Sequence, residues 1–90
     1  MAEWQVYIVR CLDQSLYTGV AKDVESRVSA HNAGRGAKYT NSRRPVVLVY
    51  REAAESYGAA LQREHAIKRM RAEAKRSLIA GYGGHPDLPQ

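Results

Sequence analysis

The sequence has little cysteine and no long apolar stretch, and each absence excludes a class of protein. Cys11 is the only cysteine among 90 residues, which excludes an internal disulfide and a zinc site built from several cysteines. No apolar run approaches the roughly 20 residues that a membrane-spanning helix needs. The first residues also lack the basic and apolar regions of a signal peptide. We therefore expect a cytoplasmic protein without a membrane partner.

The size and composition predict one globular domain. Ninety residues can enclose one modest core. With 44% hydrophobic and 26% charged residues, the chain can bury enough apolar surface to fold, unlike a disordered protein. We expect the domain to span residues 1–82. Residues 83–90 contain glycine and proline, and we expect a flexible C-terminal tail there.

Acidic residues are absent from residues 33–51, which we call the basic segment. Its basic residues are Arg35, Lys38, Arg43, Arg44 and Arg51. The other nine basic residues balance the nine acidic ones, so this segment carries the whole surplus of +5. Such a patch suits a polyanion because bound phosphates release their counterions, although a solvated loop is an equally simple explanation. Gly34 and Gly36 allow close backbone approach and Tyr39 offers an aromatic face, which favours nucleic acid.

Two tyrosines ten residues apart lie in short apolar, β-prone stretches. Tyr7 belongs to residues 4–10 and Tyr17 to residues 16–20, with turn residues between them. This pattern predicts a β-hairpin. Residues 46–50 form a continuous, largely β-branched run, which predicts a buried third strand.

Three helices are predicted around these strands. Asp23 is a typical N-cap for a helix that ends near residue 32, and Gly34 follows as its C-terminal cap. Ser56 begins a second helix that continues to about residue 70, and a third covers residues 72–80 and stops at Gly81. The predicted fold is a small α/β (α+β) domain, a three-stranded antiparallel sheet flanked by about three helices.

Glu64 occupies an unusual position on the second predicted helix. Its neighbours on one face, at about 100° per residue, are Ala60, Leu61, Ile67 and Arg71. This places a carboxylate in the stripe that faces the sheet, at a cost on the order of several kcal/mol unless it is paired or binds a metal. An ion pair with Lys68 is the simpler explanation when Glu64 is considered alone. The two tyrosines and a helical Arg27–His31 pair favour a metal ligand.

Simpler explanations exist for the other candidates too. Tyr7 and Tyr17 could be ordinary half-buried strand residues. Arg27 and His31 lie four residues apart on the face of Val24 and could extend along apolar surface. Residues 68–76 contain five basic residues, a pattern typical of a solvated helical face. Through Lys68 they could also extend a nucleic-acid surface.

Taken in order, these residues resemble the GIY-YIG nuclease superfamily. The paired tripeptides of that family are similar to Val6-Tyr7-Ile8 and Tyr17-Thr18-Gly19 in this chain. The resemblance continues through the helix with Arg27 and His31 and the stretch 34–40, and ends beyond Glu64. It is closest to small stand-alone bacterial members, which are similar to the nuclease domain of a structure-specific Holliday-junction endonuclease subunit. That family's three-stranded antiparallel sheet with flanking helices agrees with the predicted fold.

The resemblance implies metal-dependent hydrolysis of phosphodiester bonds. Glu64 matches the single glutamate that holds Mg²⁺ or Mn²⁺. Tyr17 matches the tyrosine that activates the attacking water, and Tyr7 positions that water or the phosphate. The choice of base stays open, because Tyr7 or a hydroxide on the metal could serve instead. The phosphate would be contacted by further residues: Arg27 would stabilise charge in the transition state, and His31 and Tyr39 would bind phosphate or relay a proton.

Departures from the family pattern concern packing and specificity. Val6 replaces the first glycine of the tripeptides and Thr18 the isoleucine of the second, both packing positions. Val20 stands where excision-repair relatives carry a lysine, and no late asparagine can be placed. No zinc finger or helix-turn-helix accompanies the domain. We therefore expect weak, structure-directed or single-strand DNA binding, with a protein partner as another source of specificity and no small-molecule cofactor.

Two functions follow from these observations. The first is a Mg²⁺-dependent endonuclease acting on single-stranded, flapped or branched DNA in repair or recombination. The second is a non-catalytic nucleic-acid-binding module that keeps the nuclease fold. The carboxylate favours the first, because it would repel a phosphate unless a cation lay between them. In both, Arg35, Lys38, Arg43, Arg44 and Lys68 are the predicted nucleic-acid contacts.

Overall fold

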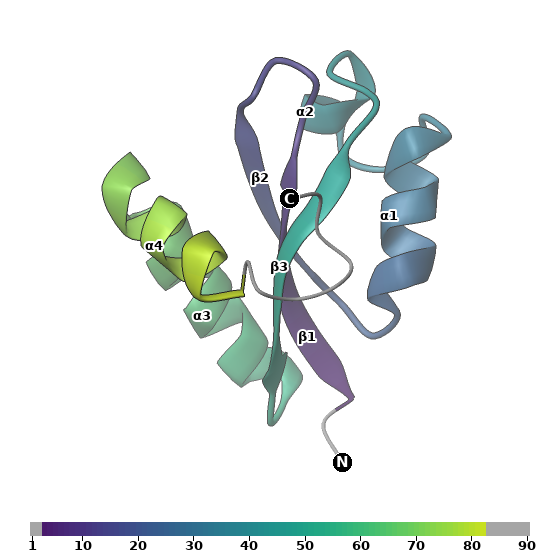
Figure 1. Cartoon of the computed structure of the whole chain (residues 1–90). Coiled ribbons are helices and arrows are strands. Elements are labelled where there is room, and N and C mark those ends of the chain that lie inside the picture. Colours follow the sequence, from purple (N-terminus) through teal and green to yellow (C-terminus); the bar gives the residue numbers. More distant parts are fainter. Residues whose placement is uncertain (1–2, 83–90) are drawn as a thin grey trace.

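The structure, a computed structural model, describes residues 3–82. Its elements in chain order are β1 (Trp4–Arg10), β2 (Leu16–Ala21), α1 (Val24–Asn32), α2 (Lys38–Asn41), β3 (Val47–Ala54), α3 (Tyr57–Lys68) and α4 (Ala72–Tyr82). The strands form one antiparallel sheet in the order β2-β1-β3, with helices on both faces (Figure 1). The predicted α+β fold is confirmed. No helix in the described range is long and apolar enough to cross a membrane.

The alternation of side chains along β1 divides the core in two. Val6 and Ile8 pack toward α3 with Ala60 and Ile67, whereas Tyr7 and Val9 belong to a second cluster on the α1 side. In a strand, successive side chains point to opposite faces, so both faces of this central strand are buried. Tyr7 is thereby directed toward α1. In Figure 1, α3 and α4 lie on one side of the sheet and α1 on the other.

The caps confirm the predicted helix starts. The Asp23 side chain accepts a hydrogen bond from the Ser26 N–H at 3.1 Å, and Ser56 Oγ accepts one from the Ala59 N–H at 3.0 Å. After α1, Gly34 has a φ of 82°. The N–H groups of Gly34 and Arg35 bond back to the carbonyls of His31 and Ala30, as in a Schellman motif. This closure turns the chain back along α1.

Several boundaries differ from prediction. The β3 strand continues to Ala54 because its second half pairs with the start of β1, with Trp4 opposite Ala54. Helix α3 ends at Lys68, earlier than expected. The predicted stop at Gly81 was wrong, since α4 runs to Tyr82, whose ring packs edge-on against Tyr50. The predicted tail, residues 83–90, lies outside the described residues.

The basic segment contains a short helix that the sequence pattern did not predict. Helix α2 covers four residues and follows the turn after α1. The Thr40 hydroxyl donates to the Ala37 carbonyl at 2.9 Å, and two backbone N–H groups also donate to that carbonyl. The segment therefore folds back against α1 instead of forming an open loop.

Candidate active site

A buried hydrogen bond joins the hairpin to α1. The Tyr7 hydroxyl oxygen lies 2.8 Å from His31 Nε2, and both side chains are about 1% exposed. Tyr7 comes from the central strand and His31 from the last turn of α1. The alternation of β1 and the packing of α1 on the sheet therefore bring together two predicted site residues that are 24 positions apart.

Two glycines make room for this pair. A Cβ atom on Gly19, which lies opposite Tyr7 in the sheet, would stand 2.5 Å from the Tyr7 hydroxyl. A Cβ on Gly36 would stand 2.6 Å from Cγ of His31 and 2.8 Å from its Cα. Real Cβ atoms do not approach that closely, so both positions exclude a side chain. Gly36 was predicted to allow a ligand near the backbone, but its open face is occupied by His31.

The second nitrogen of His31 has a partner of its own. His31 Nδ1 lies 2.7 Å from Thr40 Oγ1 and 3.3 Å from the backbone nitrogen of Ala37. Thr40 is fully buried. The imidazole is therefore held at both nitrogens, by Tyr7 on the strand and by Thr40 on α2.

The surroundings of the pair favour neutral forms of both groups. Burial, reinforced by the nearby Tyr17, raises the pKa of Tyr7 to about 12, against the opposing effect of a hydrogen bond from Arg27. Burial also lowers the pKa of His31 below its ordinary value, and the neighbouring Arg27 guanidinium acts in the same direction. At neutral pH we therefore expect an uncharged imidazole beside an uncharged phenol.

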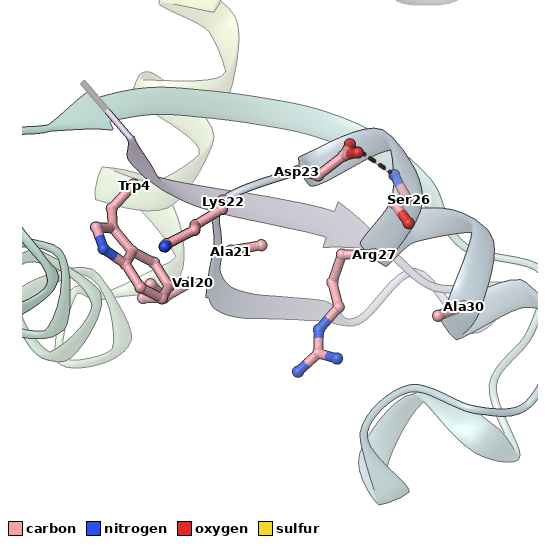
Figure 2. Close-up of a pocket in the computed structure, with 8 residues that line it drawn as sticks. All are labelled: Trp4, Val20, Ala21, Lys22, Asp23, Ser26, Arg27 and Ala30. Atoms are coloured by element: carbon pink, nitrogen blue, oxygen red, sulfur yellow. Dashed lines mark hydrogen bonds between the residues drawn. The ribbon is translucent and has the colours of Figure 1, made fainter. Parts of the chain in front are cut away.

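Arg27 brings a positive charge to the pair from the same face of α1 as His31, with its side chain reaching solvent. Its guanidinium is close enough to oppose the rise in the Tyr7 pKa, and it forms no ion pair with any residue of the described chain. It lines a shallow groove of about 330 Å³ between α1 and the end of the hairpin. Figure 2 shows its side chain extending away from the helix on the side where Trp4 and Lys22 also lie. An anion entering this groove would meet an unpaired guanidinium.

Tyr17 and Tyr39 form a stack at the edge of the site. Their ring centroids are 5.9 Å apart with an interplanar angle of 24°. Tyr17 also meets the His31 ring edge-on, with the ring centroids 5.3 Å apart. Lys68 Nζ lies 5.8 Å from the Tyr17 centroid. The Arg43 guanidinium carbon lies 4.0 Å from the Tyr39 centroid. The stack therefore connects residues from β2, α1, α2 and α3.

Glu64 is half-buried near this cluster. Its side chain is 20% exposed and pairs with Lys68 Nζ at 3.3 Å, and its charge is close enough to influence the Tyr7 pKa. The face of α3 that is buried against the sheet is narrower than predicted. Ala60 and Ile67 are buried, but Leu61 is 40% exposed and Arg71 also faces solvent. Leu61 faces outward because α3 packs on the sheet with the Ala60 and Ile67 side.

The donors around Glu64 suit a hard divalent cation. No group of three or more His, Cys, Asp or Glu side chains that could hold a metal occurs within residues 3–82. Mg²⁺ does not require such a group, since it keeps several waters and commonly binds one or two carboxylates together with substrate phosphate. One half-buried carboxylate whose charge acts on Tyr7 meets that need. Lys68 would have to share the Glu64 carboxylate with the cation or break its ion pair with it.

The arginines of the basic segment are largely engaged within the chain. Arg43 pairs with Asp13 at 3.2 Å and donates to the Tyr39 carbonyl. Arg44 donates to the carbonyls of Asn41 and Asn32. Arg51 pairs with Glu25 at 2.7 Å. Within residues 3–82, the side chains of Arg35 and Lys38 have no such partners and are exposed.

The structure thus brings five predicted residues into one site: Tyr7, Tyr17, Arg27, His31 and Glu64. Tyr39 lies at its edge, in the stack with Tyr17. Sequence reasoning did not assign a role to Thr40 or the Ala37 backbone. The only available signal was Gly34 and Gly36 just before Thr40, which indicated a chain reversal but not its target.

Comparison with known proteins agrees with this geometry. Residues 3–77 match the GIY-YIG catalytic domain. The chain belongs to the GIY-YIG family. The predicted family is therefore confirmed, and the match supports a nuclease domain.

The relatives are small bacterial proteins. UPF0213 protein SH2523 from Staphylococcus haemolyticus is 53% identical over 79 residues, which cover 88% of this chain and 96% of that protein. A UPF0213 protein from Staphylococcus aureus is 58% identical over 74 residues, covering 82% and 90%. The solution NMR structure of UPF0213 protein BH0048 from Bacillus halodurans is 38% identical, with a TM-score of 0.60 over 93% of this chain and 89% of that one. These names state no activity.

Proposed function

We propose that this protein is a metal-dependent endonuclease that hydrolyses DNA phosphodiester bonds in single-stranded, flapped or branched DNA, with a role in repair or recombination. The observation that carries the proposal is the buried Tyr7–His31 hydrogen bond beside the unpaired Arg27 and the half-buried Glu64. A binding surface has no need of a neutral base next to a phenol. Membership of the GIY-YIG family supports the same assignment.

The attacking water loses its proton to Tyr7 in the proposed reaction. A free Tyr7 phenolate is rare at neutral pH because the pKa is raised to about 12. The phenolate is avoided if the Tyr7 proton passes to His31 Nε2, 2.8 Å away, as the Tyr7 oxygen takes a proton from water. The resulting hydroxide attacks phosphorus, the bond from phosphorus to the 3′ oxygen breaks, and the leaving oxygen takes a proton from solvent water. Tyr7 thus takes the role that the resemblance implied for Tyr17.

Tyr17 and Arg27 act on the phosphate in this proposal. Tyr17 is the more exposed of the two phenols, and its hydroxyl is available to orient the phosphate or the water. Arg27 supplies a fixed positive charge next to Tyr7, where negative charge develops on the phosphoryl oxygens. Tyr39, stacked on Tyr17, holds that ring in position.

Glu64 is the proposed ligand of a single Mg²⁺ or Mn²⁺. When bound, the cation would neutralise charge on the phosphate and on the leaving oxygen. Lys68, which pairs with Glu64 at 3.3 Å, balances the buried carboxylate and can turn to a DNA phosphate. DNA strands would be held outside the site by Arg35 and Lys38. Protein partners that target the enzyme to particular DNA structures are part of the proposal.

The Glu64–Lys68 pair also supports a second candidate, a non-catalytic nucleic-acid-binding module. With Lys68 on its carboxylate, Glu64 is already neutralised and would not repel DNA without a metal. In that case DNA binding would be independent of Mg²⁺, and no cleavage would accompany it.

The test is a cleavage assay on labelled single-stranded, flap, four-way-junction and duplex DNA. The wild type is compared with Glu64→Gln, and Glu73→Gln on α4 serves as the matched control because Glu73 is exposed and outside the site. We expect metal-dependent cleavage by the wild type and Glu73→Gln, lost in Glu64→Gln. If the wild type bound DNA but did not cleave it with either Mg²⁺ or Mn²⁺, the second candidate would be supported instead.

A further inference from the structure

Three short contacts run in series through the buried imidazole of His31. The Tyr7 oxygen is 2.8 Å from Nε2, Nδ1 is 2.7 Å from Thr40 Oγ1, and Thr40 Oγ1 is 2.9 Å from the Ala37 carbonyl oxygen. A carbonyl can only accept, so the last of these contacts requires the Thr40 proton. The direction of the whole series then follows from that one bond.

If Thr40 donates to Ala37, its oxygen has only lone pairs to offer His31. Nδ1 must then carry the imidazole proton and donate it to Thr40, and Nε2 is left as an acceptor for the Tyr7 hydroxyl. All three contacts are hydrogen bonds in this arrangement. The Tyr7 oxygen also keeps its lone pairs free toward the Arg27 guanidinium, which acts on the Tyr7 pKa.

Each tautomer makes hydrogen bonds of three of the four contacts around His31 and Thr40, but the opposite tautomer loses one of the shorter ones. With the proton on Nε2, Thr40 can donate either to Nδ1 or to Ala37, and the other contact brings two lone pairs together at 2.7 or 2.9 Å. Its one gain is a bond from the Ala37 N–H to Nδ1, which is the longest contact of the group at 3.3 Å. The Nδ1–H form gives up only this longest contact, leaving the Ala37 N–H without His31 as acceptor, whereas the opposite form gives up a contact of 2.7 or 2.9 Å. Because shorter contacts make stronger hydrogen bonds, the three shorter contacts favour the Nδ1–H tautomer.

No charged group reverses this choice. The groups that face His31 are Tyr7 from β1, Tyr17 from β2, Arg27 from its own helix, and the Ala37–Thr40 turn from the basic segment. None is an acid that would draw the proton to Nε2. Within residues 3–82, Glu64 is the one carboxylate whose charge acts on Tyr7, and it is paired with Lys68.

We propose that Thr40 is a positioning residue that holds His31 in the Nδ1–H tautomer, so that Nε2 is directed at the Tyr7 hydroxyl as a proton acceptor. The tautomer is a property of the folded chain. Its catalytic consequence rests on the proposed function: Tyr7 can release its proton to His31 only when Nε2 is unprotonated. When the proton transfers, Nδ1–H stays bonded to Thr40 and stabilises the imidazolium, as an orienting group does in a triad.

The experiment that tests this is a long-range ¹H–¹⁵N NMR correlation of the imidazole nitrogens, at a pH where His31 is neutral. In the wild type we expect the Nδ1–H pattern. In Thr40→Val, which keeps the shape and removes the hydroxyl, we expect a shift toward Nε2–H. Thr40→Ser should restore the wild-type pattern. An Nε2–H pattern in the wild type would overturn the proposal even if Thr40→Val failed to fold, and so would an unchanged pattern in a folded Thr40→Val.

The same variants test the link to cleavage. Thr40→Val should lower kcat by about 10²-fold, the usual contribution of a general base, with little change in KM for DNA, and Thr40→Ser should recover most of it. A tautomer that switches with no change in kcat would refute the catalytic role. If the wild type has the expected tautomer but cleaves no DNA, the proposed function fails while the assignment of Thr40 to the tautomer stands.

Discussion

The imidazole of His31 lies directly over the backbone of Gly36, leaving no room for a side chain at that position. The glycine belongs to the basic segment, and the histidine to the end of α1. Their contact joins the segment that was expected to bind nucleic acid to the buried histidine that we propose as the proton acceptor. The basic segment is therefore part of the framework of the candidate active site.

Gly36→Ala should displace His31 and lower both activity and stability. A Cβ would collide with the ring and with its Cα, and overpacking of this kind costs about 1–3 kcal/mol. Thermal or urea unfolding and a cleavage assay measure the two effects. Gly81→Ala on α4 is the control, because a Cβ there meets nothing within 4 Å and alanine favours a helix. A Gly36→Ala variant as active and stable as that control would contradict the close contact.

The stability of the fold should fall as the pH drops below about 6.5, the ordinary pKa of histidine. The pKa of His31 is lower in the folded protein than in the unfolded chain, so the unfolded chain takes up the proton first and gains from it. The loss should continue until the pH passes the folded pKa and then level off. Urea unfolding from pH 7.5 to 5 should show this decline, and His31→Gln should reduce it. A decline of equal size in both proteins would assign it to other groups.

Neutralising Arg35 and Lys38 should weaken binding to every DNA sequence alike. Both side chains are exposed and lack partners within residues 3–82, so their loss should leave the fold intact. Removing two phosphate contacts should reduce the slope of log Kd against log salt by about 1.4 to 1.8. Arg76→Gln on α4 is the single-charge control. If the double variant lost much more affinity for some DNA sequences than for others, contacts to the DNA backbone would not explain the loss.

Variants of Glu64 should separate cleavage from DNA binding. In EDTA, Glu64→Gln should bind DNA as tightly as the wild type or more tightly, because a carboxylate near the phosphate is removed. Fluorescence anisotropy with labelled flap DNA measures this, and Glu73→Gln again provides the comparison. Weaker binding by Glu64→Gln than by Glu73→Gln in the absence of metal would indicate that Glu64 supports the fold or the DNA contact instead.

The sequence was sufficient for features that depend on local chemistry. Alternation along residues 4–10 predicted the central strand, and the short polar side chains of Asp23 and Ser56 predicted helix starts because each can accept from a backbone N–H two or three residues on. Glu64 could be placed near the sheet because helical periodicity is regular. The ends of a strand that depend on its pairing with another strand could not be predicted from local chemistry. The length of β3 depends on its pairing with the first residues of β1.

The contacts of the basic segment depend on tertiary structure. Composition alone cannot distinguish Arg43 and Arg44, which bond to the chain itself, from Arg35 and Lys38, which do not. Thr40 escaped notice for the same reason. Its hydroxyl reaches His31, nine residues earlier, only after the chain has reversed and formed one short helix.

The most direct test of the account is the single-turnover cleavage rate of Tyr7→Phe, measured on the preferred DNA at saturating protein beside the wild type and Tyr17→Phe. Tyr7→Phe removes only the hydroxyl that bonds to His31 Nε2 at 2.8 Å. If Tyr7 takes the proton of the attacking water, its loss should slow cleavage by about 10²-fold to 10⁴-fold, with DNA binding unchanged and a smaller loss in Tyr17→Phe. Cleavage by Tyr7→Phe at the wild-type rate would contradict the proposed role of the Tyr7–His31 pair.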